Sequence, residues 1–193
     1  MNDFKGYLLL GYEHIVNLAA LDHILFIIAF MAPYMTKHWV KILIGLSLFT
    51  LGHSITLSLS ALDFIKVNKA WVEFLIPLTI VITALLNLTK AGQDPKNKLK
   101  TWIALLFGLI HGLGFSNYYQ MLVLGEGKGQ YWTALIPFNL GIELGQLLIG
   151  TVLLLAMVVH QYMLNKKAKD WNLFVSGVAF GLALIMCIRQ WPL

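Results

Sequence analysis

Long apolar runs alternate with short polar segments along the whole chain. Each run has enough residues, about 18 or more, to cross the ~30 Å hydrocarbon core of a bilayer as a helix. The pattern therefore predicts an all-α, polytopic integral membrane protein with about six transmembrane helices in a single domain over residues 1–193. The six runs cover residues 15–34, 39–62, 71–88, 102–124, 131–163 and 171–188.

The tryptophans support this division of the chain. Five of them open a predicted run and the sixth follows the last run: Trp39, Trp71, Trp102, Trp132, Trp171 and Trp191. Tryptophan concentrates at the two membrane–water interfaces, so these positions are typical of an aromatic belt.

The composition excludes a soluble protein. Hydrophobic residues make up 59% of the chain, charged residues 12%, and the mean hydropathy is +0.75, whereas soluble domains are roughly a quarter charged. The net charge of +5 comes mainly from loop lysines, which report membrane orientation and not nucleic-acid binding. The one cysteine, Cys187, excludes an internal disulfide and disfavours a thiolate metal site.

The lysines also predict the orientation. The connections after the first, third and fifth runs are richer in positive charge than the opposite side, and the richer side is normally cytoplasmic. Both termini are therefore expected outside, in the inner membrane of a bacterium. The richer side carries Lys37, Lys41, Lys90, Lys96, Lys98, Lys100, Lys166, Lys167 and Lys169, and the other side Lys5, Lys66, Lys69, Lys128 and Arg189.

Ionisable and amide side chains interrupt five of the apolar runs. Such residues are costly in hydrocarbon and usually face a partner, an ion or a water-filled cavity. Their positions place them in the middle and the outer half of the membrane, with almost none in the cytoplasmic half, which predicts a site open to the periplasm. Imidazoles with carboxylates are ligands for divalent first-row metals, here nickel, zinc, cobalt or iron. The predicted ligands are His14, Asp22, His23, His53, His111 and Glu143.

Two of these ligands lie in the first run, and a third lies directly before it. Asp22 precedes His23 directly, and an acceptor beside a histidine commonly orients a metal-bound imidazole. His14 lies nine residues before His23, so the two point to opposite sides of an ideal helix. One of them is therefore expected to cap or gate the site while the other binds the ion, and His14 is equally compatible with a hydrated interfacial histidine.

The second and fourth runs contribute one histidine each. His53 lies in a stripe of hydroxyl residues at three- or four-residue steps, which either serve the site or tighten helix packing. His111 lies between Gly108 and Gly112, whose spacing allows two helices to approach closely. The stripe consists of Ser47, Thr50, Ser54 and Ser58.

The fifth run places Asn139, Glu143 and Gln146 on one helical face, beside a small-residue face of Gly141 and Gly145. Glu143 is predicted to be a ligand or the proton-handling group; the alternative is a neutral glutamic acid that bonds an amide. Residues predicted to orient ligands or gate the site are Glu73, Asn139, Gln146 and Ser54. Glu73 lies near the outer surface, where a purely solvated role is the alternative.

Together these motifs resemble a known family, the HupE/UreJ hydrogenase and urease accessory membrane proteins. The similar segments are Gly11-x-x-His14-Ile15, Leu21-Asp22-His23-Ile24-Leu25-Phe26, Phe49-Thr50-x-Gly52-His53-Ser54, Val72-Glu73-x-Leu75-Ile76, Phe107-Gly108-Leu109-x-His111-Gly112 and Phe138-Asn139-x-Gly141-x-Glu143. The resemblance implies a nickel- or cobalt-related role, commonly that of a permease, with the intramembrane histidines as ligands. In the family a glycine often precedes the Asp-His pair, whereas this chain has Ala20-Leu21.

Two functions follow from these residues. A permease or metal-binding accessory protein needs ligands that bind and then release an ion. An intramembrane metalloenzyme, a mono- or dinuclear hydrolase or oxidase with Glu143 or Asp22 as its catalytic group, would explain why the candidate ligands exceed four. The partners expected are the lipid bilayer and a divalent metal ion, with no nucleic acid. Six spans are few for a transporter, which leaves room for a homodimer.

Overall fold

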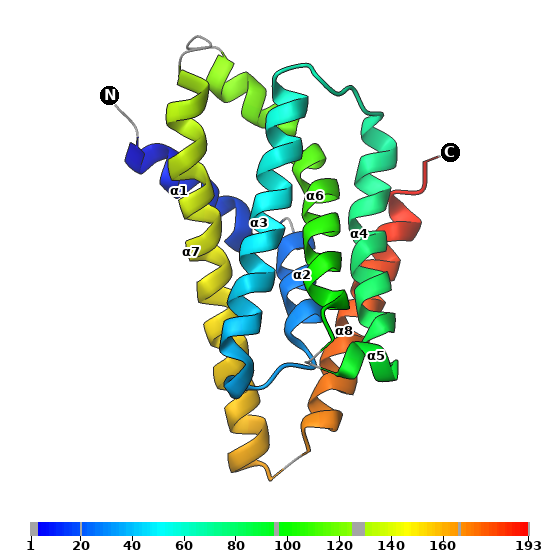
Figure 1. Cartoon of the computed structure of the whole chain (residues 1–193). Helices are drawn as coiled ribbons and strands as arrows, with labels where there is room; N and C mark the ends of the chain where they lie inside the picture. Colours follow the sequence, from blue (N-terminus) through cyan, green and yellow to red (C-terminus); the bar gives the residue numbers. More distant parts are fainter. Residues whose placement is uncertain (1–3, 20, 95–96, 125–129, 166, 193) are drawn as a thin grey trace.

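The computed structural model describes residues 4–19, 21–94, 97–124, 130–165 and 167–192, and within these ranges every regular element is helical (Figure 1). A 3₁₀ turn (η1, Thr36–His38) precedes α3, and a π-helical turn (η2, Val159–Met163) extends α7. The α-helices are α1 Phe4–Val16, α2 Asp22–Met31, α3 Trp39–Ala61, α4 Lys69–Leu86, α5 Lys90–Gln93, α6 Leu99–Leu124, α7 Gln130–Val158 and α8 Ala168–Arg189.

Five helices of the described residues are long and apolar enough to cross a membrane: α3, α4, α6, α7 and α8. They correspond to the second to sixth predicted runs and, when η2 is counted with α7, begin and end within about three residues of them. Trp39, Trp71, Trp102 and Trp191 are each more than half exposed near the helix ends, as an interfacial belt requires. The chain is an all-α polytopic membrane protein, as predicted.

The prediction of one continuous first span is wrong. The chain leaves the helix after Val16 and re-enters it at Asp22, which gives two shorter helices. Side chains on both sides of this break bond to the local backbone: Asn17 accepts from the N–H of Ala19 at 2.9 Å, and Asp22 from the N–H of His23 at 3.0 Å. Such local bonds compete with the helical ladder. With ten residues, α2 extends about 15 Å, half the hydrocarbon core.

Helix α2 lies inside the bundle, where it packs against α4, α7 and α8 (Figure 1). Helix α3 lies beside α6 and α7, while α1 packs against α7. The connection between α3 and α4 and both ends of the described chain lie toward the same end of the bundle. This end is called the outer end below, and the end at η1 and α5 the inner end; which side of the membrane each faces remains the prediction made from the lysines.

Glycines allow the closest helix contacts, as their spacing predicted. A Cβ atom on Gly108 would lie 2.1 Å from the carbonyl oxygen of Phe49, and one on Gly112 would lie 2.1 Å from that of His53. No side chain fits at these distances, so α3 and α6 approach at their backbones. This contact sets His53 and His111 at a similar depth in the bundle.

Candidate metal centre

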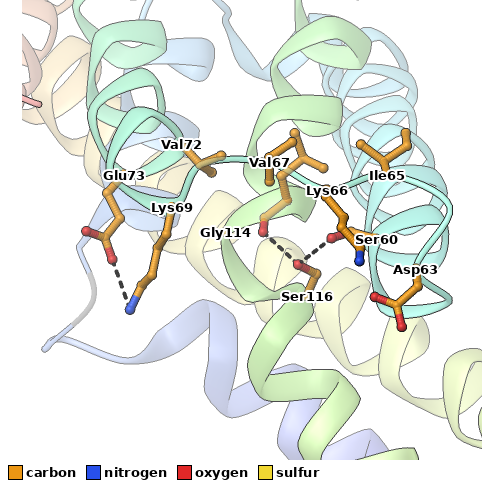
Figure 2. Close-up of a pocket in the computed structure, with 11 residues that line it drawn as sticks. Ser60, Asp63, Ile65, Lys66, Val67, Lys69, Val72, Glu73, Gly114 and Ser116 are labelled. Carbon is orange, nitrogen blue, oxygen red and sulfur yellow. Dashed lines mark hydrogen bonds and ion pairs between the residues drawn. The ribbon is translucent and has the colours of Figure 1, made fainter.

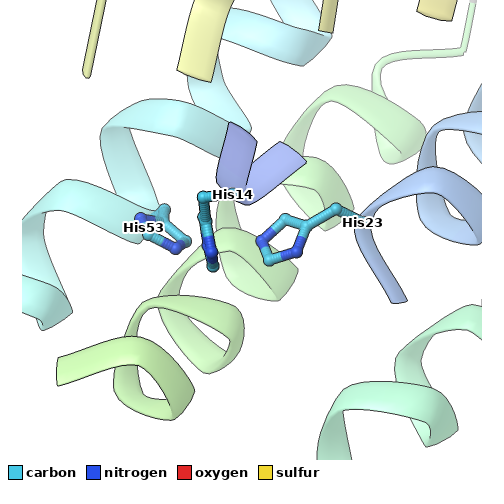
Figure 3. A group of neighbouring side chains, drawn as sticks. All are labelled: His14, His23 and His53. Atoms are coloured by element: carbon cyan, nitrogen blue, oxygen red, sulfur yellow. The ribbon is translucent and has the colours of Figure 1, made fainter. Parts of the chain in front are cut away.

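Four histidines from four helices meet inside the bundle, His14 of α1, His23 of α2, His53 of α3 and His111 of α6. The ring centroid of His23 is 4.5 Å from that of His14, 5.7 Å from that of His53 and 5.2 Å from that of His111. Figure 3 shows the His14 ring between those of His53 and His23. Segments far apart in the sequence therefore converge on one polar site.

The expectation that His14 and His23 point to opposite sides is wrong, because it assumed a single helix. The break between Val16 and Asp22 lets α1 approach from another direction than α2. As a result the His14 ring meets the His23 ring edge-on, with an interplanar angle of 66°. The same break places Asp22 and His23 at the N-terminal end of α2, where a carboxylate is favoured by the helix dipole.

The potential donor atoms form two groups that share His23. His14, His23 and His53 form one group, and Asp22, His23 and His111 form the other; within each group the donor atoms lie within 4.8 Å of one another. Asp22 Oδ1 also lies 3.3 Å from Nδ1 of His23, the contact that the adjacent positions predicted. An ion held by three imidazole or carboxylate donors at about 2.0–2.2 Å needs donor atoms that lie this close to one another. The donor atoms of each group would have to move only slightly closer together to bind it.

Several of these imidazole nitrogens are buried without a hydrogen-bond partner among the described residues. His23, His53 and His111 are buried, and each residue is at most 3% exposed. Nε2 of His14 and His23, Nδ1 of His111 and both ring nitrogens of His53 have no partner. Buried polar atoms are nearly always paired, so a cluster of unpaired nitrogens calls for an explanation. A divalent metal ion fits it, because neutral imidazole nitrogens are its usual ligands.

Glu143 belongs to neither group. Its Oε2 accepts a hydrogen bond from Ser47 at 3.4 Å, on the face of α7 that contacts α3. Gln146 and Asn139 lie on this same face, as predicted, with Oε1 of Gln146 3.2 Å from Oγ1 of Thr50 and Oδ1 of Asn139 2.6 Å from Oγ of Ser54. These polar residues of α7 therefore pair with the hydroxyl stripe of α3, and the structure does not bring Glu143 among the imidazoles.

A cleft of about 600 Å³ leads to the histidines from the outer end of the bundle. His14, Asp22, His23 and His111 line its depth, and Glu73, Gln190 and Asn17 line it further out. It adjoins a smaller pocket of about 290 Å³ beside the α3–α4 connection, and Glu73 lines both (Figure 2). Glu73 is partly exposed and forms an ion pair of 3.4 Å with Lys69. It is therefore placed at the entrance to the cleft and not among the donor groups.

Three phenylalanines close the opposite side of the site. Phe49 and Phe107 each precede a site histidine by one helical turn, and Phe26 follows His23 by about one turn, so all three lie on the inner side. They are at most 5% exposed. The rings of Phe26 and Phe49 stack with centroids 4.5 Å apart, and the Phe26 ring meets that of Phe107 at 6.3 Å. The cleft thus ends at the histidines, and the three phenylalanine rings lie between the histidines and the inner end of the bundle.

Two polar features were missed from the sequence. Thr79 of α4 contacts the site directly, with Oγ1 3.1 Å from Nε2 of His111. Its spacing alone did not distinguish it from other threonines in apolar helices. The second feature is Lys100, which was expected in a cytoplasmic loop but lies in the first turn of α6 and is 3% exposed.

Lys100 belongs to a buried polar cluster near the inner end, so the expectation of almost no polar side chains in that half is wrong. Its Nζ donates to Oδ1 of Asn87 and lies 5.5 Å from the centre of the Tyr34 ring. Asn87 in turn donates to Ser176 at 2.8 Å, and Asn172 donates to the Asn87 carbonyl at 3.1 Å. The cluster ties α4, α6 and α8 together.

Comparison with known proteins agrees with these motifs. No curated protein and no solved structure matches the chain. The model of the family described as HupE / UreJ protein matches residues 1–191 of the 193 in the chain. That match includes all the residues of the histidine cluster and every helix described above. The chain therefore belongs to the HupE/UreJ family.

Proposed function

We propose that this membrane protein binds a divalent first-row transition metal ion, nickel or cobalt in the first instance, and acts as a permease or metal-binding accessory protein for it. The ion is its cargo, taken up through the outer cleft. The proposed ligands are His23, with His14 and His53 on one side and Asp22 and His111 on the other.

One observation carries this proposal. The imidazoles converge from four helices and present buried nitrogens that have no partner among the described residues. Desolvating such groups costs free energy, and neither the neighbouring phenylalanines nor the backbone compensates for it. A bound dication would satisfy several of them together.

The one-sided access supports transport in particular. A transporter holds its cargo near the middle of the bilayer, where discontinuous helices build the site and access alternates between the two sides. Here the first span is discontinuous, the cleft opens outward, and Phe26, Phe49 and Phe107 close the inner side. This is the arrangement expected of an outward-open state. We propose the bacterial inner membrane as its location, with the outer end toward the periplasm.

The donors of both groups come from a single chain, so the proposed site needs no second copy. Glu143 is proposed to act through packing and hydrogen bonding between α3 and α7, because its carboxylate accepts a hydrogen bond from Ser47 of α3.

An intramembrane metalloenzyme is the second candidate, favoured by the size of the cleft. About 600 Å³ exceeds what a hydrated ion needs and falls in the range of small-molecule sites. In that case a metal-bound water would be the nucleophile and Asp22 the neighbouring base. Metal that exchanges readily with a chelator favours a protein that carries the ion as cargo, whereas metal retained during substrate turnover favours a metalloenzyme.

Elemental analysis of purified variants tests the site. His23→Ala, His53→Ala and His111→Ala should each bind much less nickel or cobalt, because each removes a donor from the shared cluster. His38→Ala and His160→Ala are matched controls, since both histidines lie outside the two donor groups. Equal metal content in all five variants would refute the proposed site. Nickel uptake by proteoliposomes then separates a permease from a binding protein.

A further inference from the structure

Thr79 makes two close contacts through one hydroxyl group. Its Oγ1 lies 2.6 Å from the carbonyl oxygen of Ile76 and 3.1 Å from Nε2 of His111. A threonine hydroxyl has a single proton to donate. The carbonyl can only accept, and two oxygens 2.6 Å apart without a proton between them would repel each other. The proton therefore lies toward Ile76, and Thr79 accepts from His111.

This assignment determines the tautomer of His111. A neutral imidazole carries one proton, and the contact with Thr79 places it on Nε2. Nδ1 then carries the free lone pair. That atom is buried and has no partner among the described residues, and His111 belongs to the Asp22–His23–His111 group.

His23 is held in the opposite way. Its Nδ1 lies 3.3 Å from Asp22 Oδ1, a carboxylate oxygen that can only accept, so Nδ1 carries the proton and Nε2 the free lone pair. Nε2 is likewise buried without a partner among the described residues. The two anchored histidines thus offer different ring nitrogens, each selected by a neighbouring oxygen.

We propose that Thr79 is a positioning residue that fixes His111 as the Nε2–H tautomer and presents Nδ1 to a divalent transition metal. The inference rests on the proposed function and deepens it. By contrast, neither ring nitrogen of His53 has a partner among the described residues. His23 and His111 are therefore oriented before an ion arrives, whereas His53 is oriented by the ion itself.

The test compares three variants of the purified protein by cobalt titration. Thr79→Val keeps the shape but removes the acceptor, and loss of such an orienting partner typically weakens metal binding about 10- to 100-fold. Thr79→Ser retains the hydroxyl and should restore both the affinity and the visible cobalt spectrum of the unchanged protein. Thr83→Val is the matched control. Thr83 is equally buried on the same helix, one turn away, but bonds to the carbonyl of Thr79 and not to a histidine.

Nitrogen-15 NMR of histidine-labelled, metal-free protein provides an independent measurement, with the His111 signals assigned by their loss in His111→Asn. The proposal expects a protonated Nε2 in the unchanged protein and a changed tautomer population in Thr79→Val. A protonated Nδ1 in the unchanged protein would overturn it, as would cobalt affinity and spectrum that are the same in Thr79→Val. If the unchanged protein binds no cobalt while NMR finds the expected tautomer, the proposed function fails and the orientation by Thr79 stands.

Discussion

Replacing Gly11 by alanine tests whether the packing of α1 on α7 holds His14 in the site. Gly11 is buried, and a Cβ atom at this position would lie 2.0 Å from the backbone carbonyl oxygen of Phe138. Backbone cannot rotate away as a side chain can. The two helices would therefore have to separate, and His14, one turn further along α1, would move with them.

The size of the movement follows from the contact distance. Real Cβ contacts start at 3.0 Å, so the helices must open by at least about 1 Å at this point. Overpacking of this kind typically costs about 1–3 kcal/mol of stability. Donor groups need placement within about 0.5 Å, so we expect His14 to be lost as a donor and metal affinity to fall on the order of tenfold. The Asp22–His23–His111 group does not include α1 and should retain residual binding.

Cobalt titration and thermal unfolding of the purified protein measure the two effects. Gly177→Ala is the control, because a Cβ atom on Gly177 would meet nothing within 4 Å. The double variant Gly11→Ala with His14→Ala should bind cobalt no more weakly than His14→Ala alone, since two changes acting through one group are not additive. Unchanged affinity and unchanged unfolding temperature in Gly11→Ala would refute the packing of α1 on α7.

Two further predictions concern Glu143 and the membrane orientation. Glu143→Gln should keep its metal affinity, because the amide can still accept a hydrogen bond from Ser47 and the carboxylate lies outside both donor groups; a collapse of metal binding, measured by elemental analysis, would return Glu143 to the site. A cysteine at position 93, Gln93→Cys in a Cys187→Ser background, should resist membrane-impermeant thiol reagents in intact cells, because the lysine bias places this exposed residue in the cytoplasm; efficient labelling would reverse the orientation.

The long helices could be predicted from the sequence because hydropathy and interfacial tryptophan report directly on the bilayer. The break in the first span could not be read in this way. The run stays apolar across the break, at Leu18, Ala19 and Leu21, and its first glycine or proline is Pro33. The signal lay in Asn17 and Asp22, whose side chains bond to nearby backbone N–H groups. Two such residues spaced five apart indicate a helix end followed by a helix start.

The candidate site was predictable as a set of residues but not as a geometry. His23, His53 and His111 could be identified because an unpaired imidazole in an apolar span is costly in free energy and needs a partner. The same reasoning identified Glu143, yet that side chain points elsewhere. The rotation of α7 about its axis depends on the face that α1 covers, at Gly141 and Gly145. Single-sequence periodicity gives the faces of a helix but not the neighbour that each face meets.

The broken first span also affects how the protein is made. The ten residues of α2, eight of them apolar, are too few to form a membrane crossing without help, so this segment depends on α4, α7 and α8, all of which leave the ribosome later. His14 likewise reaches its place only when α7 is available to α1. The final positions of α1 and α2 therefore depend on helices that follow them in the chain. If the histidines bind a metal ion as proposed, the complete donor set is available only once α6 has supplied His111 and α7 has positioned α1.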